Sequence, residues 1–172
     1  MAIQVAKRLG AGRVVGAGRD RARLATLPGL GADATVALTD DAEATAAALA
    51  ETAAEVDPVV DCLWGRPAGD AIMALLRARA GRSRALNWIQ IGSMADPTIE
   101  LPSVAMRSAN FRLQGNGQGV VSTRPYLAVL PSLIEEIDGG TIAVTARTMP
   151  LAEVGTAWTE PEVPGVRTLL TP

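Results

Sequence analysis

The sequence offers few side chains for acid–base, nucleophilic or metal chemistry. It contains no histidine, one cysteine, Cys62, and one lysine, Lys7. Without histidine the usual zinc sites and every histidine-based general base are excluded, so we expect no zinc in this chain. Ser122, Thr123 and Tyr126 are close in sequence, but no histidine or lysine partner accompanies them. No Asp or Glu pair stands out either, so we assign no catalytic residue and expect Cys62 to be a buried small residue rather than a nucleophile.

Three short segments are better suited to binding a ligand, and each follows a predicted strand. Ligands of open parallel sheets bind outside the carboxyl ends of the strands. Gly92 and Gly115 are favoured because a ligand can approach a backbone that carries no side chain. Ile91 and Leu113 fit equally well as core residues, and Trp64 as a packing or interface aromatic. The segments are Cys62-Leu63-Trp64, Ile91-Gly92-Ser93 and Leu113-Gln114-Gly115.

The elements that must position these segments alternate between short β-branched runs and amphipathic helical stretches. This order is typical of an α/β fold, with a mostly parallel, doubly wound sheet covered by helices on both faces. Asp20 and the 39–41 segment are expected to cap helices, and Gly10 and Gly139-Gly140 to end them. Strands are expected at 13–17, 34–37, 57–63, 84–91, 110–114, 142–147 and 166–170, and helices at 2–9, 21–27, 39–54, 67–79, 102–108, 124–138 and 151–158.

Composition limits the classes of partner. The 172 residues are 48% hydrophobic and 20% charged, enough to form one domain with a sizeable core. A formal net charge of −2 provides no positive field for a nucleic acid. No apolar run is long enough to cross a bilayer, and the first residues do not resemble a signal peptide. We therefore expect a cytoplasmic protein with neither a nucleic-acid nor a membrane partner.

The first predicted element is unusual, because the helix at 2–9 has no strand before it. In a parallel β–α–β unit, the strand precedes its helix. Either this helix decorates a complete sheet, or the sequence starts inside such a unit.

The second option is favoured by a resemblance that runs along the whole sequence. In order and spacing, its segments are similar to the C-terminal, cofactor-binding portion of the medium-chain dehydrogenase/reductase superfamily, which includes zinc-type alcohol dehydrogenases and quinone oxidoreductases. The segments are Met1 to Val14, Leu30 to Asp33, Val60 to Gly65, Ile91 to Ser93, Arg107-Ser108 with Asn110-Phe111, Leu113 to Gly115, Pro150 to Val154 with Ala157-Trp158, and Val166 to Leu170.

The resemblance implies a truncated Rossmann domain at 1–148 and a C-terminal return segment at 149–172 that would pack toward a catalytic domain. It also implies that the first Rossmann strand and the glycine loop, whose amides bind the pyrophosphate at a helix N-terminus, are missing. Gly10, Gly12, Gly16 and Gly18 alternate around a strand and turn, so we reject them as that loop. The sequence leaves open whether it is a gene fragment or has a misassigned start.

Cofactor choice follows from the same resemblance. Domains that bind NAD place an acid at the end of the second Rossmann strand, whereas NADP enzymes place a cation there. That position is Gly18, followed by Arg19, with Arg23 one helical turn on. We therefore predict NADP(H) rather than NAD(H). The resemblance also places Arg167 at the pyrophosphate and the three strand ends at the ribose and nicotinamide, although Arg167 fits equally well as a surface charge.

Three functions remain open. The first is the cofactor-binding part of an NADPH-dependent oxidoreductase that transfers hydride to or from a small carbonyl, enone or quinone. The second is an inactive remnant that acts as a dimerising α/β domain with weak or no nucleotide binding. The third is an unrelated nucleotide or methyl-donor binder. Under the first two, the resemblance implies a homodimer formed through the edge strand at Asn110–Gln114.

A missing first strand has a structural consequence. It would lie between the strands at 13–17 and 58–63, leaving backbone groups on two edges without partners. We predict that these strands pair directly, or that another segment or chain fills the gap. Two open edges would speak against an independently stable domain.

Overall fold

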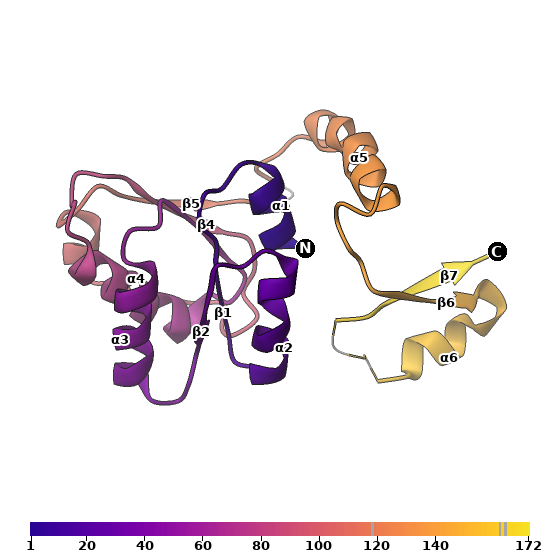
Figure 1. Ribbon diagram of the computed structural model, residues 1–172, viewed down its shortest axis with the longest axis horizontal. Helices are drawn as coiled ribbons and strands as arrows, with labels where there is room; N and C mark the ends of the chain where they lie inside the picture. The colour runs from indigo at the N-terminus through magenta and orange to yellow at the C-terminus, as the bar shows by residue number, and fades with distance from the viewer. Residues whose placement is uncertain (118, 162, 164) are drawn as a thin grey trace.

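Helices and strands alternate along the chain, and the described strands form three parallel sheets (Figure 1). The computed structural model describes residues 1–117, 119–161, 163 and 165–172. The strands are β1 (Val15–Gly18), β2 (Ala34–Ala37), β3 (Pro58–Asp61), β4 (Leu86–Gln90), β5 (Phe111–Gly115), β6 (Ala146–Pro150) and β7 (Arg167–Thr171). The helices are α1 (Ala2–Arg8), α2 (Arg21–Thr26), α3 (Ala42–Ala53), α4 (Gly65–Ala78), α5 (Thr123–Asp138) and α6 (Val154–Thr159), with short 3₁₀ turns η1 (Leu27–Leu30), η2 (Ser103–Met106) and η3 (Leu151–Glu153). The predicted α/β class is confirmed.

The helix ends follow from local side-chain chemistry. An Asp20 carboxylate oxygen accepts the Arg23 N–H at 3.1 Å, and Asp41 accepts the Ala44 N–H at 3.0 Å, so both cap the helices that follow them. Gly10 and Gly140 have φ angles of +87° and +74°, the left-handed conformation predicted for helix ends.

Several predicted boundaries differ from the structure, and two of them have a clear local cause. The strand expected at 142–147 begins at Ala146, because Ile142 is buried and its N–H donates to the Glu136 carbonyl at 3.0 Å, completing the end of α5. Helix α4 begins at Gly65 rather than Pro67. The N-cap Trp64 and the first helical residue Gly65 both have positive φ, and this turn directs the chain into the helix two residues earlier than predicted.

The core lies between the sheets and the α3–α4 helix pair. Ile72 of α4 and Leu86 of β4 are fully buried, and Trp88 and Phe111 pack in the same cluster. Val36 of β2 belongs to this cluster as well. One core therefore joins the β1–β2 sheet to the β3–β4–β5 sheet.

These two sheets are nevertheless not hydrogen-bonded to each other. Within the described residues β1 pairs with β2 only and β3 with β4 only, so the first predicted alternative, direct pairing of β1 with β3, is wrong. The other alternative, that another chain fills the gap, stays a prediction. Helix α3 connects β2 to β3 and packs against α4. Adjacent helices pack about 8 to 10 Å apart, which is twice the roughly 4.8 Å spacing of paired strands. Contact between α3 and α4 therefore does not bring β1 and β3 within hydrogen-bonding distance of each other. Two open edges remain, against the expectation for an independently stable sheet.

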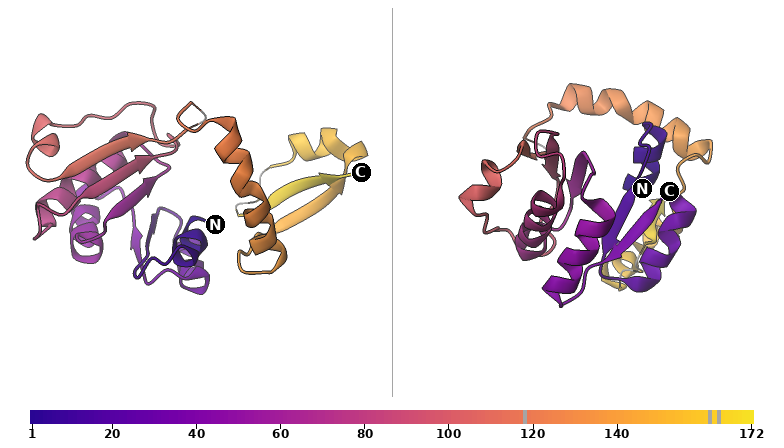
Figure 2. Two further views of the ribbon diagram at one scale, coloured as in Figure 1. Left: turned by 90° about the horizontal axis from the view of Figure 1, so that it is seen from above. Right: turned by 60° about the vertical axis from the view of Figure 1, so that its left-hand side comes forward.

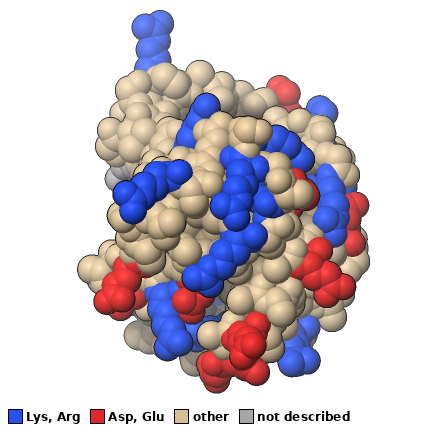
Figure 3. Space-filling model, turned by 90° about the vertical axis from the view of Figure 1, so that its left-hand side faces the viewer, with Lys and Arg blue, Asp and Glu red and all other residues tan. Residues whose placement is uncertain are grey.

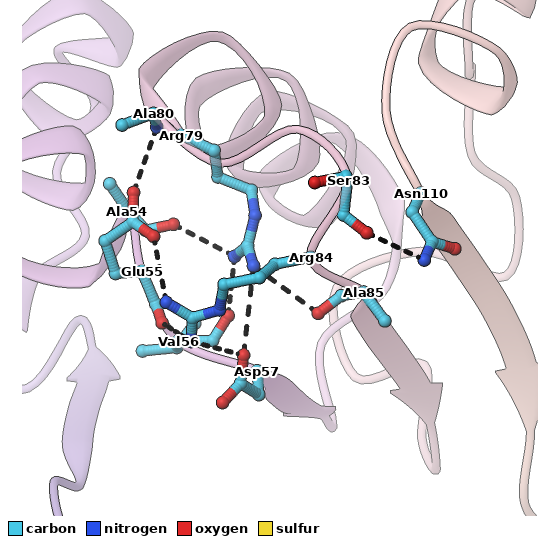
Figure 4. A network of polar contacts seen from close by, with 10 residues as sticks. All are labelled: Ala54, Glu55, Val56, Asp57, Arg79, Ala80, Ser83, Arg84, Ala85 and Asn110. Carbon is cyan, nitrogen blue, oxygen red and sulfur yellow. Dashed lines mark hydrogen bonds and ion pairs between the residues drawn. The ribbon is translucent and has the colours of Figure 1, made fainter.

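A buried arginine, Arg79, links the segments that lead into the amino-terminal ends of β3 and β4 (Figure 4). The Arg79 side chain is inaccessible to solvent and donates to the carbonyls of Ala54, Val56 and Ala85 at 3.0, 2.6 and 3.4 Å. Its guanidinium also lies 3.9 Å from Asp57. These contacts join the segment after α3 to the one before β4.

The C-terminal elements lie to one side of this core (Figure 1). Arg8 Nε of α1 donates to Glu136 Oε1 of α5 at 2.6 Å, and the Gln4 side chain binds the backbone of Ala143 after α5. Beyond it, β6 and β7 form a parallel pair connected through α6 (Figure 2), and Trp158 on α6 is 87% exposed. The predicted boundary at 148/149 falls inside β6 and stays a prediction. Among the described helices, none combines the length and apolar character needed to cross a bilayer.

A pH-dependent contact anchors α1. Lys7 Nζ lies 2.7 Å from Asp33 Oδ2, which also accepts the Val14 N–H at 2.6 Å, and these bonds lower the Asp33 pKa. A lowered folded-state pKa contributes stability above the ordinary value of 3.8, which is lost as pH falls through the folded-state pKa. We expect Lys7→Met to raise the Asp33 pKa toward that value in an NMR titration of the carboxyl carbon. Arg13→Met, which removes only a weaker charge, should change it less; equal shifts would contradict this assignment.

Candidate functional site

A cavity of about 380 Å³ lies where β3, β4 and β5 end. Because these strands are parallel and adjacent, their carboxyl ends meet at one edge of the sheet. Trp64, Ser93 and Gly115, all proposed from the sequence, line the cavity together. The other lining residues are Gln90, Pro97 and Leu113.

The loops that follow β3 and β4 are bound to each other through their backbones. The N–H groups of Met94 and Ala95 donate to the carbonyls of Cys62 and Leu63 at 3.1 and 2.8 Å. Gly65 has a φ of +62°, and a Cβ placed there would lie 2.6 Å from the Asp96 Cβ. Only glycine fits both requirements, so this position fixes the approach of the two loops.

The two glycines favoured from the sequence have different surroundings. At Gly115 a Cβ would meet no atom within 4 Å, and the residue lines the cavity, as a site of ligand approach requires. At Gly92 a Cβ would lie 3.0 Å from the Cys62 carbonyl oxygen. The absence of a side chain at Gly92 therefore serves the packing of β3 against β4.

Cys62 differs from its expected burial, and for Ile91 and Leu113 the structure decides against the core position, which was one of two alternatives. Cys62 is exposed rather than buried, because it follows the last residue of β3. Partial desolvation and the neighbouring Asp61 charge raise the pKa of its thiol, which disfavours the nucleophilic thiolate. Ile91 is 43% and Leu113 36% exposed, so neither is a core residue, and of the two only Leu113 is among the described lining residues.

The remaining predicted residues lie apart from the cavity. Gly18 ends β1, Arg19 follows it, and both lie outside the described lining. Arg23 on α2 has its guanidinium against Gly165, where a Cβ would lie 2.9 Å from Arg23 Nη2. Arg167 begins β7, and its N–H donates to the Thr145 carbonyl at 2.9 Å. The predicted residues thus form one group at β1 with α2 and one at the ends of β3 to β5, while Arg167 lies on β7.

Sequence reasoning missed Asp61, Gln90 and Pro97. Asp61 is buried at the end of β3 and accepts hydrogen bonds from the segment that follows. The side-chain amide of Gln90 donates to the Gly92 carbonyl at 2.9 Å. An acid directly after the two valines of a predicted strand was an available signal for Asp61, whereas Pro97 reaches the cavity only through the loop after β4.

The residues present fit a planar organic ligand better than a metal. Among the described residues there is no group of three or more Cys, Asp or Glu that could hold a metal ion, and the sequence has no histidine, so the described residues offer no ligand set for zinc. The indole of Trp64 and the side chains of Leu113 and Pro97 suit a flat ring, while Gln90 and Ser93 offer polar groups for an amide substituent.

Gly16, one of the glycines around β1, serves the packing of the strand rather than the approach of a ligand. A Cβ at Gly16 would lie 2.5 Å from Leu27 Cδ1 and 3.3 Å from Ile3 Cδ1, so this glycine serves the packing of β1 on α1 and η1.

Charge is unevenly distributed despite the small net value. On the face that carries the left-hand elements of Figure 1, Lys and Arg side chains cover much of the centre, while Asp and Glu lie mainly toward the lower and right margins (Figure 3). Anionic ligands that approach this face meet local positive charge.

Comparisons with protein families and with solved structures both match dehydrogenases and oxidoreductases. A family model described as zinc-binding dehydrogenase matches residues 1–113. The structure is similar to a cinnamyl alcohol dehydrogenase from Sorghum bicolor (25% identity, TM-score 0.64, 91% of this chain and 39% of that one). It is also similar to a mycobacterial quinone oxidoreductase (19%, TM-score 0.70, 90% and 46%) and to a mycobacterial protein complexed with NADPH (21%, TM-score 0.66, 90% and 46%). The chain thus spans less than half the length of each of these three structures. No curated protein sequence matches it.

Proposed function

We propose, because the chain belongs to the zinc-binding dehydrogenase family, that it is the cofactor-binding part of an NADPH-dependent oxidoreductase. The reaction would be hydride transfer between the nicotinamide and a small carbonyl, enone or quinone. The observation that carries this proposal is the cavity at the ends of β3, β4 and β5, which is lined by groups suited to a flat ring with an amide. The mycobacterial complex with NADPH supports a nicotinamide cofactor.

The chain's own residues would bind and orient that ring. When bound, the dinucleotide supplies or receives the hydride. Trp64 and Leu113 would cover apolar ring surface and exclude water, while Gln90 and Ser93 would hydrogen-bond the carboxamide and fix which face of the ring is presented. No step is assigned to zinc, because the described residues provide no ligand set.

The preference for NADP(H) is proposed from the end of β1. Gly18 provides no acid to bind a ribose hydroxyl, and the exposed Arg19 and Arg23 offer cations to a 2′-phosphate. Arg167 is a further candidate for the pyrophosphate. Because these side chains lie outside the cavity, they would bind the adenosine half of the dinucleotide, at a distance from the nicotinamide.

Ligand-induced thermal stabilisation tests the cofactor and its preference. We expect NADPH to raise the Tm, and 2′,5′-ADP to bind more tightly than 5′-AMP. A Cβ at Gly18 meets only Leu24 Cδ2, at 3.8 Å, so Gly18→Asp fits sterically. We expect it to weaken 2′,5′-ADP binding about tenfold, because a carboxylate repels the 2′-phosphate. Gly12→Asp, also free of steric contact, is the matched control and should leave the preference unchanged.

Two outcomes would contradict the proposal. If NADPH causes no shift at concentrations far above typical dissociation constants, the chain does not bind the cofactor by itself. If 5′-AMP binds more tightly than 2′,5′-ADP, the preference for NADP(H) is wrong.

The absence of a shift would favour the second function, an inactive dimerising α/β domain. A homodimer is proposed under either function, through β5, which has a free outer edge within the described sheet. Sedimentation equilibrium tests it, and a monomer mass at micromolar concentration would contradict it. We further propose that residues 149–172 pack against a catalytic domain, in keeping with the exposure of every residue of β7. A cytoplasmic location stays a prediction.

A further inference from the structure

Asp61 is a buried acid at the junction of two strands and a turn. It is 6% exposed, and no ion pair reaches it from the described residues. Its Oδ1 accepts the N–H groups of Leu63 and Trp64 at 2.8 and 3.1 Å, and its Oδ2 accepts the Trp88 indole N–H at 3.0 Å. Three donors thus hold one carboxylate in place of a cation.

The backbone of Asp61 adds a second set of bonds. Its carbonyl accepts the N–H groups of Ile91 and Gly92 at 2.8 and 3.3 Å. One residue therefore binds both the turn after β3 and the chain that leaves β4. Both segments contribute to the cavity, through Trp64 and Ser93.

We propose that Asp61 is the positioning residue of the cavity, its carboxylate holding the turn in the conformation that places Trp64 in the wall. Trp64 has a φ of +56°, a conformation that residues other than glycine rarely adopt. The two hydrogen bonds from the turn to Oδ1 compensate for that strain. Its consequence for cofactor binding rests on the function proposed above for this cavity.

A carboxylate is required because all three partners donate. An asparagine has one acceptor oxygen and one donor NH₂ group. If the oxygen of Asn at this position served the turn, its NH₂ would face the Trp88 indole N–H, and two donors would oppose each other. The substitution Trp88→Phe removes that indole donor and retains an aromatic ring.

Amide hydrogen exchange of the whole chain tests the proposal. We expect Asp61→Asn to reduce the protection of the Leu63 and Trp64 amides at least tenfold, while that of Leu75 in the core helix α4 stays unchanged. The double variant Asp61→Asn with Trp88→Phe should recover most of the protection, because the donor conflict is removed. A purely structural role predicts the opposite, since a second core substitution would lower protection further.

The outcomes separate this inference from the proposed function. Fast exchange of Leu63 and Trp64 in the unaltered chain, or a double variant worse than Asp61→Asn alone, would overturn the positioning role. If Asp61→Asn does not fold, the single variant Trp88→Phe decides the question. In that variant Asp61 still accepts the Leu63 and Trp64 amides, so both amides must stay protected. Loss of their protection would overturn the role.

A cofactor measurement completes the test. Energy transfer from tryptophan to NADPH, measured in a Trp158→Phe background, should show at least tenfold weaker binding for Asp61→Asn and partial recovery in the double variant. Unchanged affinity would overturn the link between the turn and the cavity. If the unaltered chain binds no NADPH, the proposed function fails, while the exchange data still decide the role of Asp61.

Discussion

Replacing Arg79 with methionine is expected to lower the free energy of unfolding by about 3 kcal/mol. The substitution keeps a long apolar stem and removes the guanidinium that donates to three carbonyls at the amino-terminal ends of β3 and β4 (Figure 4). Buried acceptors that lose their donor keep the cost of desolvation without its compensation. Urea denaturation followed by circular dichroism measures the loss.

Arg77→Met is the matched control for this prediction. Arg77 lies on the same helix, is exposed, and should change stability by less than about 0.5 kcal/mol when its charge is removed. Arg84→Met tests the rim of the network, where the ion pairs to Glu55 and Asp57 are half exposed and worth at most about 1 kcal/mol. Equal losses for Arg77 and Arg79 would show that the buried network does not stabilise the fold.

Gly65→Ala is expected to cost about 3 kcal/mol and to disrupt the cavity. One part of this cost is the φ of +62°, which an L-residue adopts only with strain. The larger part is the collision of the new Cβ with Asp96, 2.6 Å from its Cβ and 3.1 Å from its amide nitrogen. Relief of that collision requires the loop after β4 to move away from the turn after β3, and this would separate Trp64 from Pro97 across the cavity.

Gly140→Ala separates the two contributions. Gly140 has a similar φ of +74°, but a Cβ there would meet no atom within 4 Å. Its substitution should therefore cost only about 1 kcal/mol, the price of the backbone conformation. Chemical denaturation and ligand-induced shifts of both variants test the comparison. A Gly65→Ala protein as stable as Gly140→Ala would mean that the two loops are not in contact.

The order of elements was predictable from the sequence because it depends on local chemistry. Asp20 and Asp41 stand where a helix needs an acceptor, and Gly10 and Gly140 where it needs a left-handed residue. The strand at 34–37 was predicted with the bounds that β2 has. The strand predicted at 142–147 started too early at Ile142, because an apolar residue buried against a helix end and one buried in a strand look the same in the sequence.

The candidate site was only partly predictable. Trp64, Ser93 and Gly115 follow separate strands, and the rule that parallel strands end at one edge is enough to bring them together. The separation of Arg19, Arg23 and Arg167 from this cavity was not visible, since no local pattern encodes the distance between two sheets. The burial of Arg79 was hidden for a similar reason, because the carbonyls it binds come from segments 6 to 25 residues away.

The sequence by itself therefore determined the α/β class, the positions of helix caps, and the lack of a histidine-based zinc site. All of these follow from residue type and spacing along one chain. The tertiary structure alone decided that β1 and β3 do not pair, that Gly92 serves packing, and that Asp61 binds both walls of the cavity. Those outcomes depend on helix packing distances and on backbone atoms brought together from separate elements, which no periodicity records.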